Sequence, residues 1–134
     1  RVNPALKNIP DWMHGIGSFD PMHYKKSGTP KEYIIEEEVN CSTLMDLLNE
    51  HNITKIDLLK IDVEGYDYEV LKMVDFEKIK PAIIRYEHGG LSKLVKTSAE
   101  RLLIDNGYSI LVDGNDTSAV LDNEPGWMFD SKMQ

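Results

Sequence analysis

The residues best suited to chemistry are two carboxylates and a glycine that close the most apolar stretch of the chain, namely Asp62, Glu64 and Gly65. In an extended chain, residues two apart point to the same side, so Asp62 and Glu64 are expected to lie together. Gly65 allows a tight turn or the close approach of a ligand. Such a pair could hold a metal, bind an ammonium group, or act as a base with a raised pKa. The alternative is a solvated turn in which Glu64 or Asp67 favours a helix N-terminus.

Glu87 and His88 form a second candidate pair, directly after the apolar run at residues 82–86. A carboxylate beside an imidazole is a combination that general acid–base chemistry uses. Adjacent residues of a strand point to opposite sides, so we expect only one of the two to face a ligand. A surface histidine without a chemical role is the alternative.

The elements around these residues predict a strand–helix–strand unit. Residues 56–61 form a short apolar run that is typical of a strand buried on both faces of a parallel sheet. Residues 68–79 have helical spacing of their apolar side chains, and residues 82–86 form the second strand. About thirty residues is the length of a βαβ unit. Ligands of open α/β sheets bind outside the carboxyl ends of the strands, where both candidate pairs fall.

The remaining pattern predicts a loop-rich lead-in over residues 1–30 and an α/β core over residues 31–134. That core is expected to begin with an edge strand at 33–39, which contains three glutamates, and a helix that begins after Thr43 and ends near 52. A second helix is expected from 91 to the Asn106-Gly107 cap. An antiparallel hairpin of strands 108–112 and 117–121 follows, and then a turn at 123–126 before the Trp127 segment.

Composition limits the class of protein. The chain has 134 residues, a net charge of −8 and a single cysteine, Cys41. An acidic chain argues against a nucleic-acid partner, and one cysteine excludes an internal disulfide and fits a reducing compartment. No apolar run has the length of a membrane span, and no signal-peptide pattern opens the sequence. We therefore expect one cytoplasmic α/β domain with no membrane partner.

Several weaker features have ordinary explanations. Lys60 lies inside the apolar run, where it either pairs with a carboxylate or extends past a sheet edge to water. The Gly-Ile-Gly-Ser run at residues 15–18 has no strand before it and no helical pattern after it, so we interpret it as an ordinary loop. Metal-ligand spacing is lacking among three of the histidines and the cysteine, to which we assign no chemistry: His14, His23, His51 and Cys41.

The chain resembles the FkbM family of S-adenosylmethionine-dependent methyltransferases over most of its length. The resemblance is carried by three segments in the family's order, IDLLKIDVEGYDYEVLK, KPAIIRYEH and LLIDNGYSILVDGNDTSAV. The segments VNCSTLMDLLNEHNI and GIGSF, which precede them, are similar to the family's lead-in.

This resemblance implies a Rossmann-like sheet that transfers a methyl group to a hydroxyl of a sugar or natural-product-like small molecule. Asp62 would lie beside the cofactor's sulfonium and the acceptor hydroxyl, which it could orient or deprotonate, directly or through a divalent metal. Glu64 and Glu87 would be further candidates for that role, with His88 behind them. Gly65 would join Asp62 in contacting the cofactor.

The chain also departs from the family pattern. The family carries a strand and a glycine-rich cofactor loop ahead of this region, and neither is present here. The resemblance thus covers the C-terminal portion of such a domain, with the N-terminal strands missing. The strand at 56–61 would then have an open edge, which must pair with missing chain, with a second copy in a homodimer, or with a rearranged N-terminal segment. Cofactor binding by this chain alone is left open.

Two alternatives remain beside the enzyme hypothesis. The chain could be a non-catalytic α/β module that assembles through the exposed edge, with solvated carboxylates. It could instead hold a divalent cation on Asp62, Glu64 and Glu87, where ligands that are all oxygen suit magnesium or calcium. The acceptor molecule itself is not identified by these residues.

Overall fold

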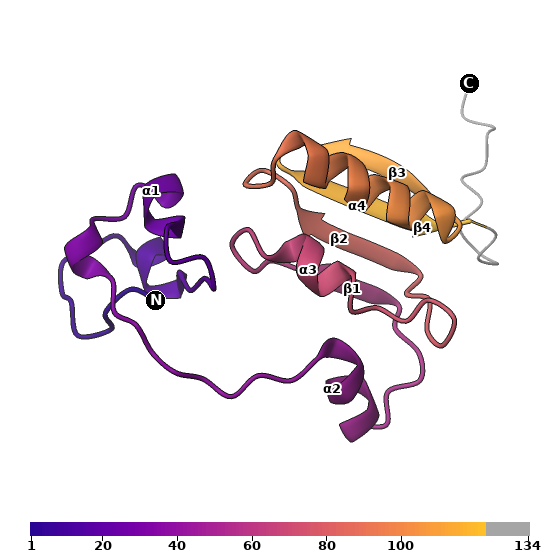
Figure 1. Ribbon diagram of the computed structural model, residues 1–134, viewed down its shortest axis with the longest axis horizontal. Coiled ribbons are helices and arrows are strands. Elements are labelled where there is room, and N and C mark those ends of the chain that lie inside the picture. Colours follow the sequence, from indigo (N-terminus) through magenta and orange to yellow (C-terminus); the bar gives the residue numbers. More distant parts are fainter. Residues whose placement is uncertain (123–134) are drawn as a thin grey trace.

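The computed structural model describes residues 1–122, so the expected turn at 123–126 and the Trp127 segment lie outside the described residues. Short helical turns come first and a four-stranded sheet follows (Figure 1). In chain order the elements are η1 (Asp11–Gly15), α1 (His23–Ser27), η2 (Lys31–Tyr33), α2 (Leu44–Glu50), β1 (Leu58–Ile61), α3 (Asp67–Leu71), β2 (Ile83–Glu87), α4 (Lys93–Asp105), β3 (Tyr108–Asp113) and β4 (Asp116–Leu121).

The strands form a mixed sheet in the order β1-β2-β4-β3. β1 pairs parallel with β2, with Leu58 opposite Ile83, so the predicted strand–helix–strand unit is confirmed. β4 pairs antiparallel with both β2 and β3, which confirms the predicted hairpin. Because β4 lies between β2 and β3, the hairpin extends the parallel pair on one side only, and β1 remains at the other edge.

The prediction that β1 is buried on both faces is wrong. Only Ile61 of its four residues is buried, and Leu58 is 58% exposed. The physical reason is that β1 is an edge strand among residues 1–122, with β2 as its neighbour in the sheet. The apolar composition that suits a central strand is therefore present on an edge strand.

The core lies between the sheet and the helices α3 and α4, which Figure 1 shows against one face of the sheet. Its fully buried side chains include Leu71 of α3, Leu103 of α4, and Ile84 of β2. Tyr108 begins β3 and donates a hydrogen bond from its hydroxyl to the Pro81 carbonyl at 2.7 Å. Each buried side chain of this size contributes about 1.5–3 kcal/mol, so this layer fixes the positions of the strand ends.

The helix predicted for residues 68–79 is shorter than expected, since α3 ends at Leu71. Asp75 accepts a hydrogen bond from the Glu77 backbone N–H, which offers the chain a turn in place of a helical bond. Phe76 and Ile79 nevertheless reach the core from this turn. The helical spacing of these residues therefore predicted correctly that their side chains are buried, but predicted incorrectly that they lie in a helix.

The strand predicted for residues 33–39 is wrong. Ile34 makes one isolated antiparallel bridge, to Val2, and the three glutamates at 36–38 are exposed without strand pairing. In this antiparallel register Asn3 lies opposite Tyr33 and Arg1 opposite Ile35, so the ladder offers the glutamates at 36–38 no partner among residues 1–122. Residues 35–42 accordingly form neither helix nor strand, and the Thr43 side chain then caps α2 by accepting from the Asp46 N–H.

In the part of the chain that the structure describes, no helix combines the length and the apolar character needed to cross a bilayer.

Candidate functional site

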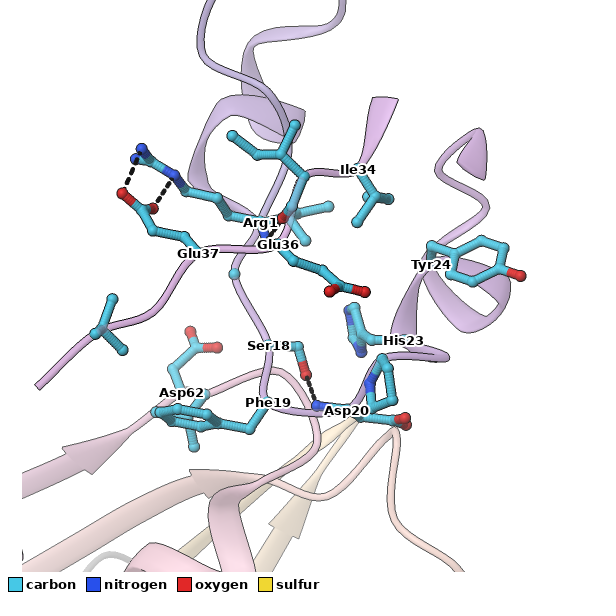
Figure 2. A pocket seen from close by; sticks show the side chains of 16 residues that line it. Arg1, Ser18, Phe19, Asp20, His23, Tyr24, Ile34, Glu36, Glu37 and Asp62 are labelled. Atoms are coloured by element: carbon cyan, nitrogen blue, oxygen red, sulfur yellow. Dashed lines mark hydrogen bonds and ion pairs between the residues drawn. The ribbon is translucent and has the colours of Figure 1, made fainter. Parts of the chain in front are cut away.

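Two pockets open where the carboxyl ends of β1 and β2 meet the N-terminal segment. The larger pocket has a volume of about 540 Å³, and Figure 2 shows Asp62 and Phe19 on its sheet side, with Ile34 and Glu36 across from them. The smaller pocket has a volume of about 410 Å³, and its lining residues are His23, Lys26, Ser27, Glu64, Gly65, Glu87, Gly89 and Gly90. Both volumes fall in the range of small-molecule sites, which is about 300–1,000 Å³.

The predicted site residues are divided between these pockets. Asp62 lines the larger pocket, whereas Glu64, Gly65 and Glu87 line the smaller one. His88 is buried and lines neither pocket, and its Nδ1 lies 2.9 Å from the Thr117 hydroxyl of β4. His88 therefore lies behind Glu87 and supports the strand end from the sheet side.

Asp62 follows β1 directly, and its side chain is about half exposed (51%). The Lys60 ammonium lies 3.0 Å from its carboxylate. Lys60 is exposed, so the lysine inside the apolar run is explained by the open edge and by this ion pair. A ligand cation in the larger pocket would compete with Lys60 for the Asp62 carboxylate.

Glu64 does not continue the extended strand, contrary to the expectation that it points to the same side as Asp62. Its φ of 53° is left-handed, and Gly65 follows with a φ of 93°. A left-handed glutamate is strained, because its Cβ crowds the backbone. The reversal directs the Glu64 carboxylate to the smaller pocket, where Oε2 lies 3.1 Å from His23 Nε2.

Asp67 is a fully buried carboxylate that sequence reasoning did not assign to the site. Its two oxygens accept hydrogen bonds from the backbone N–H groups of Gly65 and Glu87, both at 3.3 Å. Burial raises the pKa of Asp67, and the two backbone donors oppose that rise. Asp67 thus joins the turn after β1 to the end of β2, and sets the distance between the two strand ends.

The electrostatics of the smaller pocket are acidic. Partial burial raises the pKa of Glu87, and the neighbouring carboxylates Glu64, Asp62, Asp67 and Asp116 raise it further. A carboxylate in such surroundings gains from a bound cation or from a hydrogen-bond donor. The pocket therefore suits a ligand with hydroxyl or cationic groups better than an anion.

The end of β2 is also fixed from the hairpin. The Asn115 carbonyl, in the turn between β3 and β4, accepts from the N–H groups of His88 at 2.8 Å and Gly89 at 3.1 Å. A Cβ at Gly89 would come within 2.9 Å of the Asn115 side chain. The smaller pocket thus has a wall whose position depends on a close contact with the hairpin turn.

The Gly-Ile-Gly-Ser loop, interpreted above as ordinary, connects the N-terminal segment to the site. The Ser18 hydroxyl donates to the Glu64 carbonyl at 3.0 Å and accepts from the Asp20 N–H at 3.1 Å. Phe19 packs against Tyr66, with ring centroids 5.4 Å apart. These two contacts place the walls of the larger pocket against the turn after β1.

Asp20 stabilises the turn that leads into α1. It accepts from the Met22 N–H at 2.9 Å and pairs with Lys26 at 3.0 Å, and these contacts lower its pKa. The sequence missed Ser18, Phe19 and His23 as site residues because their partners lie far along the chain. Asp20 was missed although its partners are local. The glycines of the 15–18 loop were the one available signal.

Across residues 1–122, no three or more histidine, cysteine, aspartate or glutamate side chains are grouped so that they could hold a metal ion. Asp62 opens into one pocket, and Glu64 and Glu87 into the other. The alternative cation site on these three carboxylates therefore gains no support from their arrangement.

Comparison with known proteins gives one family and one curated relative. Residues 8–110 match the family model described as the methyltransferase FkbM domain. The chain is 33% identical to Methyltransferase sdnD of Sordaria araneosa over 91 aligned residues, which cover 59% of this chain and 34% of that protein. The chain thus spans about a third of the length of this relative. No solved structure matches.

Proposed function

Because the chain belongs to the family of FkbM methyltransferase domains, we propose that it forms the acceptor-side part of an S-adenosylmethionine-dependent O-methyltransferase. The acceptor is a hydroxyl of a sugar or natural-product-like small molecule, and the reaction takes place in the cytoplasm. The observation that carries the proposal is a pair of pockets at the carboxyl ends of β1 and β2, one lined by Asp62 and the other by Glu64 and Glu87. The exposed free thiol of Cys41 fits the reducing compartment.

The residues of the larger pocket fit the chemistry of the cofactor. S-adenosylmethionine carries a sulfonium and an ammonium group, and the half-exposed Asp62 carboxylate can pair with either cation. Phe19, which is 63% exposed, offers an apolar ring face to the adenine. Gly65, in the turn that follows Asp62, lines the smaller pocket and leaves room there for close backbone approach. When bound, S-adenosylmethionine supplies an already activated methyl group.

The smaller pocket suits the acceptor. Glu64 and Glu87 can accept hydrogen bonds from hydroxyl groups, and the pKa of Glu87 is raised by its partial burial and by the neighbouring carboxylates. Such bonds orient the reacting oxygen, and orientation supplies much of the rate when the methyl group is already activated. His88 has a supporting role, since it holds the end of β2 through Thr117.

The test is a calorimetric titration of S-adenosylmethionine into the full-length protein, together with release of S-adenosylhomocysteine in the presence of methyl α-glucoside, glycerol and phenol. We expect wild-type binding, and about tenfold or more weaker binding for Asp62→Asn, because a charged partner of a cation is lost. Asp57→Asn is the matched control, since Asp57 also pairs with a lysine, at 2.9 Å, but precedes β1. Absence of binding by the wild-type protein would contradict the proposal.

The open edge of β1 favours a second candidate, a non-catalytic module that assembles through this edge. This alternative predicts a dimer in sedimentation equilibrium and no effect of Asp62→Asn on any function of the protein. A monomer that binds S-adenosylmethionine would exclude it.

A further inference from the structure

His23 is a buried histidine whose ring nitrogens are not satisfied. It begins α1, and its side chain is 10% exposed. Neither Nδ1 nor Nε2 makes a hydrogen bond to any residue of the described part of the chain. Buried polar atoms in native proteins are nearly always hydrogen-bonded, so this exception requires an explanation.

The place of His23 between the two pockets suggests one. His23 lines both the larger pocket, which holds Asp62, and the smaller pocket, which holds Glu64 and Glu87. Figure 2 shows its ring extending from α1 into the larger pocket. An imidazole at this position borders both the proposed cofactor space and the proposed acceptor space, where methyl transfer would take place.

Glu64 is positioned to orient the ring. Its Oε2 lies 3.1 Å from His23 Nε2, within ion-pair distance but outside hydrogen-bond geometry. The left-handed backbone of Glu64 and the hydrogen bond from Ser18 to its carbonyl keep the carboxylate on this side of the turn. A carboxylate beside Nε2 favours the proton on Nε2, so that Nδ1 carries a lone pair that can accept a proton.

We propose that His23 is the general base of methyl transfer, with Glu64 as its positioning residue. This inference rests on the proposed function. It assigns acceptance of the hydroxyl proton to Nδ1 of His23, a role that the proposed function gives to none of the carboxylates at the strand ends. Asp62 is a weaker choice for this role, because it is half exposed and already paired with Lys60.

The step balances as follows. The acceptor oxygen forms a bond to the methyl carbon of S-adenosylmethionine, and the methyl–sulfur bond breaks with its electron pair passing to sulfur. The hydroxyl proton moves to Nδ1 of His23. The positive charge of the sulfonium is thereby replaced by the positive charge of an imidazolium, which lies beside the Glu64 carboxylate.

The test compares His23→Gln and Glu64→Gln with His14→Gln in the full-length protein. His14 is an exposed histidine of the same segment that lines neither pocket, and so it is the matched control. Three readouts are needed. The first is the calorimetric affinity for S-adenosylmethionine, and the second is single-turnover methylation of whichever of methyl α-glucoside, glycerol and phenol reacts fastest. The third is ¹⁵N NMR of the wild-type histidine rings. General-base catalysis contributes about 10²–10⁴-fold.

We expect His23→Gln to lower the single-turnover rate by about 100-fold or more, with cofactor affinity within threefold of the wild type. Glu64→Gln should lower the rate by about tenfold, and His14→Gln should leave it unchanged. The neutral ring of His23 should carry its proton on Nε2. A wild-type rate in His23→Gln, or a proton on Nδ1, would overturn the inference and leave the proposed function intact. If the wild-type protein binds no cofactor, the proposed function fails, and this inference fails with it.

Discussion

Residues 1–43 and residues 44–122 contribute different things to the molecule. All the residues of the buried apolar cluster lie in the second region, from Leu48 to Ala119, whereas the first region buries only Val2 and Ile16 among its apolar side chains. Yet the first region supplies most of the lining of the larger pocket. The second region therefore provides the stability of the fold, and the site arises where the first region meets it.

The largest expected effect comes from matched truncations in the two regions. Leu103→Ala removes a fully buried side chain of α4 and should lower the free energy of unfolding by about 2–5 kcal/mol. Val2→Ala truncates a buried side chain that lies outside the buried apolar cluster, and should cost less than half as much. Urea denaturation followed by circular dichroism measures both. Equal losses would contradict the conclusion that the second region provides the stability of the fold.

A smaller effect is expected where the regions share the turn after β1. Asp67→Asn leaves one of the Gly65 and Glu87 N–H groups without its carboxylate acceptor, which should cost about 1–3 kcal/mol. Asp113→Asn, at an exposed aspartate of β3, is the control and should change stability by less than about 0.5 kcal/mol.

Hydrogen exchange of the two amides locates this effect. In Asp67→Asn the Gly65 or Glu87 amide should exchange faster, while amides of β3 keep their protection once the change in global stability is subtracted. Unchanged exchange at both amides would mean that Asp67 does not couple the strand ends.

The smallest expected effect depends on pH. The pKa of Glu87 is raised in the folded protein, so ionising this carboxyl disfavours folding. The penalty is absent below the ordinary carboxyl pKa, grows as pH rises to the folded-state pKa, and is complete above it. Glu87→Gln should therefore stabilise the protein at pH 7 by less than about 1 kcal/mol and give no gain at pH 3. Thermal unfolding at both pH values checks this, and a larger gain at pH 3 would contradict it.

Periodicity predicted the elements that lie in the second region. The apolar runs at β1 and β2, the Asn106-Gly107 cap after α4, and the turn between β3 and β4 all report local preferences that the core reinforces. The strand predicted at 33–39 failed because pairing needs a partner, and the bridge between Val2 and Ile34 leaves the glutamates without one among residues 1–122. Local pattern also overestimated α3, where the Asp75 turn replaces the helix.

The site was predicted only in part, for a related physical reason. The strand-end carboxylates were found because apolar runs that end in charge are visible in the sequence. His23 and Ser18 were not, because they act through contacts with Glu64 that connect distant parts of the chain and leave no spacing in the sequence. The N-terminal segment that lines the larger pocket is irregular, so its sequence shows no periodicity from which the pocket could be predicted.

The contact between Gly89 and Asn115 limits how this family member can diverge. Any side chain at 89 would displace Asn115, whose carbonyl holds the end of β2. A substitution at Asn115 is therefore expected to change the smaller pocket, although Asn115 does not line either pocket. Among related proteins, replacements at the two positions should be inherited as pairs, and a hairpin exchanged from a relative should be accompanied by the matching residue at 89.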